Sequence, residues 1–124
     1  MNPFPAEHDL IELFEVEPTV LDRNVPWAYN SLTFETVRGA DRIVCEIAPG
    51  YGEVNVRWSR NDSDLVHLRL RRVAGLTIER TGVRAVLVGT FDDKAFLPLR
   101  LQLRPAVHLS WGTTDDPDAR LPAG

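Results

Sequence analysis

The residue types that most often carry out chemistry are sparse in this chain of 124 residues. The three histidines, His8, His67 and His108, are far apart, and none has a His or Cys partner at the short spacings typical of metal sites. Cys45, the only cysteine, alternates with two isoleucines, which predicts a buried structural thiol rather than an exposed nucleophile. We therefore expect no catalytic residues, no bound metal and no cofactor.

Two further sequences only superficially resemble functional motifs. Asp92 and Asp93 could pair their carboxylates, but adjacent aspartates in a turn commonly cap their own backbone. The glycine-containing segment 49–52 is not followed by a helix, so it lacks the helix N-terminus that a phosphate-binding loop requires. The sequence predicts a β-turn there.

Charge is distributed unevenly along the chain. Residues 1–53 contain three Arg and ten acidic residues, a net charge of −7, whereas residues 54–111 contain nine Arg and one Lys against five acidic residues, a net charge of +5. Such an asymmetry can be ordinary solvated surface, or it can steer a charged partner. Under the second interpretation, the partner-binding candidates are acidic residues of the first half: Glu7, Asp9, Glu12, Glu15, Glu17 and Asp22.

Three aromatic residues in predicted loops form an alternative set of candidates. Trp27, Tyr29 and Tyr51 could line the mouth of a pocket at one end of the strands, since their rings can contact ligand and water at once. This arrangement would suit a small-ligand-binding or hydrolytic barrel. The other interpretation is that the three rings cap the hydrophobic core.

Arginines make up thirteen of the fourteen basic residues, and several project from the polar faces of predicted strands. The row consists of Arg57, Arg69, Arg71, Arg100 and Arg104. Surfaces for single-stranded nucleic acid interleave exposed aromatic residues with basic ones, and these strands show none. Because the chain also has a net charge of −4 at pH 7, we do not favour nucleic acid as the partner.

The elements that must position these residues are mainly β-strands. Residues 7–15 show the apolar spacing of a short helix, which Pro18 prevents from continuing, and residues 18–30 are typical of an irregular connection. Eight runs then alternate apolar and polar residues, at 31–35, 42–47, 54–59, 66–71, 76–78, 83–87, 97–104 and 107–111. Pro98 lacks a backbone donor and favours an edge or a bulge for its strand.

Short links between the runs favour antiparallel neighbours, because parallel strands need long crossovers. We predict a mainly β fold in which an antiparallel meander of about eight strands forms a sandwich or a partly open barrel. A single β-rich domain should span residues 1–111, and residues 112–124 resemble a polar tail. No signal peptide or membrane span is recognisable, and a single cysteine favours a reducing compartment, so we expect a cytoplasmic protein.

Several segments of the chain resemble one known group of proteins. Residues 10–14 (LIELF) and 17–22 (EPTVLD) are similar to the helix and loop that open the members of this group. Trp58 with residues 64–70 (DLVHLRL) and 73–78 (VAGLTI) resembles their central paired strands. The group is that of small bacterial immunity proteins, which neutralise toxins delivered between competing cells. The resemblance implies a non-catalytic protein that binds one toxin tightly. Such toxins are often basic nucleases, which an acidic surface would suit.

Overall fold

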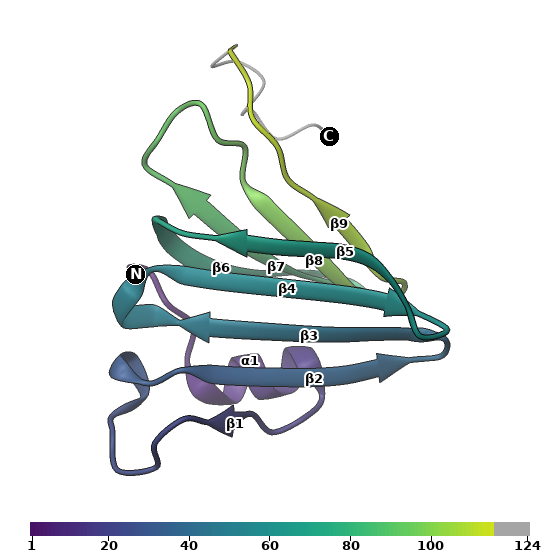
Figure 1. Cartoon of the computed structure of the whole chain (residues 1–124), viewed down its shortest axis with the longest axis horizontal. Helices are drawn as coiled ribbons and strands as arrows, with labels where there is room; N and C mark the ends of the chain where they lie inside the picture. The colour runs from purple at the N-terminus through teal and green to yellow at the C-terminus, as the bar shows by residue number, and fades with distance from the viewer. Residues whose placement is uncertain (116–124) are drawn as a thin grey trace.

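The computed structural model describes residues 1–115, which form two antiparallel β-sheets and one short α-helix (Figure 1). The five-stranded sheet contains, in order, β1 (Thr19–Val20), β2 (Leu32–Arg38), β3 (Asp41–Ala48), β4 (Glu53–Arg60) and β5 (Ser63–Leu70). The four-stranded sheet contains, in order, β6 (Val73–Thr81), β7 (Arg84–Phe91), β8 (Leu99–Arg104) and β9 (His108–Ser110). The predicted mainly β, antiparallel fold is confirmed, and residues 1–115 form two separate sheets rather than a closed barrel.

The chain passes from one sheet to the other between β5 and β6, which are not paired with each other. Arg72 in this link has a φ of 58°, in the left-handed region that sharp changes of direction often use. The two sheets are therefore separate, and each is a meander of neighbouring strands. In Figure 1 the five-stranded sheet lies in front, with the helix and the four-stranded sheet behind it.

Helix α1 spans Glu7–Phe14, within one residue of the predicted 7–15. Glu15 ends it with a φ of 58°, a left-handed conformation that commonly closes helices. The segment that follows was predicted to be irregular throughout, but it contains the two-residue strand β1, which is too short to show an alternating pattern. The strand predicted at 76–78 is longer in the structure, where β6 spans Val73–Thr81.

Pro98 does not place its strand at an edge. β8 lies between β7 and β9 and begins at Leu99, so the edge position was wrong, whereas the predicted bulge does occur in its pairing with β7, at the far end from Pro98. Because Pro98 precedes the first residue of the strand, its missing N–H removes no ladder hydrogen bond. The predicted turn at 49–52 is the 3₁₀ turn η2 (Pro49–Tyr51), after which Gly52 adopts a φ of 64°.

The hydrophobic core lies between the sheets. Strand register places Phe34, Cys45 and Val56 in one row on the inner face of the five-stranded sheet, where all three are fully buried. Helix α1 packs against this face, and Phe14 stacks on Phe34 with ring centroids 4.6 Å apart and planes at 16°. Aromatic burial of this kind contributes both area and stacking energy. The helix therefore belongs to the core.

The described part of the C-terminal segment pairs with the chain before β8. Phe96 and Thr113 form an antiparallel bridge, and the amide of Leu97 donates to the carbonyl of Gly112 at 2.9 Å. The rest of the expected tail, residues 116–124, lies outside the described residues. Within residues 1–115, no helix combines the length and apolar character needed to cross a membrane.

Candidate functional site

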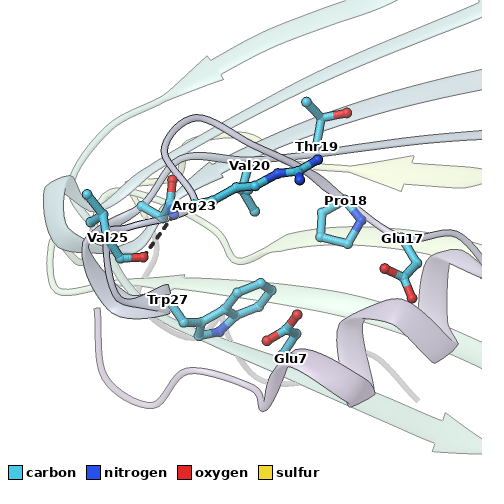
Figure 2. A pocket seen from close by; sticks show the side chains of 9 residues that line it. Glu7, Glu17, Pro18, Thr19, Val20, Arg23, Val25 and Trp27 are labelled. Carbon is cyan, nitrogen blue, oxygen red and sulfur yellow. Dashed lines mark hydrogen bonds between the residues drawn. The ribbon is translucent and has the colours of Figure 1, made fainter.

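A surface pocket of about 500 Å³ lies beside the first turn of α1 (Figure 2). Glu7 of α1 forms one wall, and the segment from Glu17 to Val20 forms another. The third wall is the loop before β2, which contributes Arg23, Val25, Trp27 and Asn30. The site thus depends on α1 and the loop being held at a fixed separation.

Asn30 fixes the loop. This buried side chain donates through Nδ2 to the carbonyl oxygens of Asp22 and Val25, at 2.6 and 3.2 Å. Its Oδ1 accepts from the amides of Asp22 and Ser31, at 3.2 and 3.0 Å. A buried amide that satisfies four hydrogen bonds holds the backbone around it rigidly. The pocket wall therefore has a defined shape without regular secondary structure.

The charged groups of the pocket are not neutralised within the protein. Glu7 and Glu17 are exposed, and neither carboxylate has an ion-pair partner in residues 1–115. Arg23 also lacks such a partner in this part of the chain. Trp27 is half-buried and packs against Phe4, with ring centroids 6.2 Å apart, and its indole nitrogen has no acceptor among the described residues. Two carboxylates beside an indole suit a cationic group.

The structure gives the other acidic candidates different surroundings. Glu12 accepts a hydrogen bond from Arg80 of β6 at 2.7 Å. Glu15 lies 3.3 Å from Nη2 of Arg38 and 3.2 Å from Nη1 of Arg104, so it links both sheets. These two carboxylates help to hold α1 in place.

The two remaining acidic candidates make only local contacts. Asp9 lies 3.4 Å from Nε2 of His8, its neighbour in the helix. Asp22 accepts a hydrogen bond from the amide of Asn24 at 2.9 Å, which shapes the loop. Of the six candidates, Glu7 and Glu17 are therefore the ones that the structure brings together around the pocket.

The aromatic candidates meet at the same end of the molecule. Trp27 and Tyr29 belong to the 3₁₀ turn η1 (Trp27–Tyr29), and Tyr51 belongs to η2, which contacts η1. Tyr29 is 73% exposed and Tyr51 is 79% exposed, so these two rings do not cap the core, and neither lines the pocket. We call Glu7, Glu17, Trp27, Tyr29 and Tyr51 the acidic–aromatic end.

The predicted row of arginines is divided between the two sheets. Arg57, Arg69 and Arg71 lie on the outer face of the five-stranded sheet. Arg100 of β8 donates to Glu79 of β6 at 2.7 and 3.3 Å, and this hydrogen bonding lowers the pKa of the Glu79 carboxyl. Arg104 pairs with Glu15. The arginines thus do not form one continuous surface.

Some residues of the site gave no sequence signal. Asn30 and Arg23 lie in a segment rich in turn-forming residues, where an amide that organises the loop looks like any other turn residue.

Cys45 is fully buried, as predicted, and burial raises the pKa of its thiol to about 12. Within residues 1–115, no three His, Cys, Asp or Glu side chains are grouped so that they could hold a metal ion.

Neither a protein-family model nor a curated protein matches the sequence. The fold is similar to that of a chain from a solved contact-dependent growth inhibition toxin–immunity protein complex of Klebsiella pneumoniae 342. The TM-score is 0.77, the sequence identity is 14%, and the match covers 90% of this chain and 96% of that chain. At this identity the comparison shows a shared fold. The resemblance predicted from the sequence is thereby confirmed at the level of the fold.

Proposed function

We propose that this chain is an immunity-type inhibitor, a non-catalytic cytoplasmic protein that binds a bacterial toxin and neutralises it. The observation that carries the proposal is the fold shared with a chain from a toxin–immunity protein complex, over nearly the full length of both chains. The segments that resemble immunity proteins in sequence agree with it. They are α1 with the following loop, and strands β4 to β6.

The acidic–aromatic end is the proposed toxin-binding surface. Glu7 and Glu17 carry charges that the fold does not use, so a basic partner can pair with them without breaking an internal contact. Tyr29 and Tyr51 are large rings held out on short turns. Protein interfaces are enriched in Tyr and Trp, which offer large contact areas at low entropic cost. Asp9 and Asp22, which contact no arginine among the described residues, add negative charge around this surface.

Co-expression with the candidate toxin tests the proposal. Because a cell that makes the toxin alone would be killed, the toxin should be encoded beside this chain, as a small domain at the C-terminus of a larger secreted protein. We expect the two proteins to co-elute in size-exclusion chromatography, with a dissociation constant near ~1 nM, or about −12 kcal/mol. Cells that carry this chain should survive expression of the toxin.

Charge-reversal variants locate the surface. Glu7→Lys with Glu17→Lys should slow association with a basic toxin by about tenfold at low salt, because charge complementarity mainly sets the association rate. A matched control is Asp64→Lys with Asp92→Lys, which makes the same change in net charge at exposed sites outside the acidic–aromatic end. Equal association rates for the two double variants would show that the toxin binds elsewhere.

Two results would overturn the immunity assignment itself. One is a candidate pair that separates on the column while the toxin still kills cells that carry this chain. The other is growth arrest caused by this chain alone, which would place it on the toxin side of such a system. Neither result depends on which surface makes the contact.

The pocket also supports a second candidate function, the binding of a small ligand. Its volume of about 500 Å³ falls within the range of about 300–1,000 Å³ that is usual for ligand sites, and Trp27 supplies an aromatic wall. Native mass spectrometry of the purified protein would detect a retained small molecule. Loss of that mass in Thr19→Trp, which fills the pocket, would favour this function over the inhibitor.

A further inference from the structure

A second concave surface lies on the outer face of the five-stranded sheet, which points away from α1 and from the four-stranded sheet (Figure 1). It is a groove of about 320 Å³ across β3, β4 and β5. The outward side chains that line it are Val44, Glu46, Glu53, Asn55, Arg57, His67, Arg69 and Arg71. We call this surface the outer groove.

Strand register brings its basic side chains together. Arg57 of β4 lies opposite His67 of β5, and Asn55 lies opposite Arg69. Arg57 and Arg69 are therefore diagonal neighbours on one face, a separation of roughly 7–8 Å that long side chains easily bridge. A single extended ligand can contact both guanidinium groups.

The two arginines differ from most others in the molecule because the fold does not use their charge. Neither Arg57 nor Arg69 has a carboxylate within ion-pair distance among the described residues, although both side chains are exposed on a face that also carries Glu46. Arg71 makes only a long contact of 3.9 Å with Glu53. The guanidinium groups thus keep their donors available, in a planar geometry that matches carboxylates.

The chemistry of the groove favours a peptide over a nucleic acid. Its three arginines outnumber its two glutamates, so the surface attracts anions, but Glu46 and Glu53 would repel a continuous phosphate backbone. No Phe, Tyr or Trp side chain lines the groove to stack on bases. A segment of protein can place carboxylates on the arginines, and its amide groups can donate to Asn55 and Glu46.

We propose that the outer groove binds an acidic segment of a protein partner, with carboxylates of that segment on Arg57 and Arg69. The proposal is separate from the toxin-binding surface, which has the opposite charge. The outer-groove proposal requires a partner with an acidic surface. It does not depend on whether the chain is an immunity-type inhibitor.

A labelled synthetic peptide in which Asp alternates with Ser is a direct probe, with the same peptide carrying Asn in place of Asp as the control. Fluorescence anisotropy at low salt should show binding of the Asp peptide only. Each exposed ion pair changes an affinity by up to about fivefold, so we expect Arg57→Gln with Arg69→Gln to weaken binding by about tenfold. Glu46→Gln should strengthen binding by about twofold, because it removes a repulsive charge.

The matched control is Arg84→Gln with Lys94→Gln, which makes the same change in net charge at exposed sites on β7 and in the loop after it, and should change the affinity by less than about twofold. The proposal is wrong if the Asp and Asn peptides bind equally, or if the double variant binds the Asp peptide as the unmodified protein does. It is also wrong if a single-stranded oligonucleotide binds to the groove more tightly than the Asp peptide at the same salt concentration. None of these outcomes bears on co-elution with a toxin.

Discussion

The arginines of the four-stranded sheet and those of the outer groove are used differently. In the four-stranded sheet, each strand arginine contacts an acceptor side chain: Arg80 with Glu12, Arg84 with Gln102, Arg100 with Glu79 and Arg104 with Glu15. In the outer groove, Arg57 and Arg69 have no such partner in residues 1–115. The contrast is between the four-stranded sheet and the outer groove, because Arg38, Arg42 and Arg60 elsewhere in the five-stranded sheet are also ion-paired.

Helix α1 explains the pairing of two of the four arginines in the four-stranded sheet. It and its C-cap provide Glu12 and Glu15, the partners of Arg80 and Arg104, whereas nothing in the described chain covers the outer groove. The acidic half of the sequence therefore neutralises part of the basic half through ion pairs at the surface. The charges without an ion-pair partner in residues 1–115 include Glu7 and Glu17 at the acidic–aromatic end, and Arg57 and Arg69 in the outer groove. These are the two places where partners are proposed to bind.

The first test asks whether the five-stranded sheet opens locally beneath the outer groove, where two arginines have no ion-pair partner within residues 1–115. Cys45 lies on the inner face of that sheet, and its thiol pKa of about 12, against an ordinary 9.0, leaves roughly a thousandfold less thiolate at pH 8. We expect iodoacetamide to modify the native protein at least about a thousandfold more slowly than the urea-unfolded chain, as followed by mass spectrometry. Rapid modification without denaturant would show that the five-stranded sheet opens locally.

The second test loosens helix α1, which together with its C-cap provides the carboxylates that pair with Arg80 and Arg104. Phe14→Ala deletes the ring that stacks on Phe34 and should lower the free energy of unfolding by about 3–5 kcal/mol, as large core truncations do. The loosened helix would leave Arg80 and Arg104 as unpaired as the groove arginines. Urea denaturation measures the loss. Leu21→Ala, at a side chain that is 82% exposed, is the control and should change stability by less than about 0.5 kcal/mol.

Most of the fold could be predicted from the sequence because strand alternation and turn residues are local signals. Phe34, Cys45 and their neighbours alternate with polar residues, so their inward orientation follows from position alone. The break between β5 and β6 could not be predicted, since short links look alike whether they join paired strands or separate sheets. The predicted edge position of Pro98 was wrong for a related reason, because the strand begins two residues later than the apolar pattern that starts at Leu97.

The site was less predictable because pairing is a property of the assembled structure. Glu7 and Glu12 look equivalent in the sequence, yet one faces a pocket and the other contacts β6. The distinction depends on which carboxylates come within reach of an arginine far away in the chain. The aromatic candidates were identified by type alone, and the strand topology then placed η1 beside η2.

The third test separates the structural carboxylates from the free ones. Glu15→Gln keeps the side-chain length and the left-handed backbone but removes the charge that links Arg38 with Arg104. We expect a loss of about 1 kcal/mol in unfolding free energy at low salt, and a smaller loss at high salt, because both pairs are partly exposed and screened. Glu17→Gln, without an ion pair, should change stability by less than about 0.3 kcal/mol. Equal losses would contradict the distinction.

The last and smallest effect concerns the pairing of Glu79 with Arg100 on the four-stranded sheet. Hydrogen bonding to Arg100 holds the pKa of Glu79 below its ordinary value of 4.5, so folding favours the ionised carboxylate. A lowered folded-state pKa adds stability that is present above the unfolded value and is lost as the pH falls through the folded value. The unfolding free energy of the unmodified protein should therefore exceed that of Glu79→Gln at pH 7, by roughly 0.2–0.5 kcal/mol for so exposed a pair. The two should converge as the pH falls below the lowered pKa of Glu79. A constant difference across this range, measured by urea denaturation at a series of pH values, would show that the pair does not couple ionisation to folding.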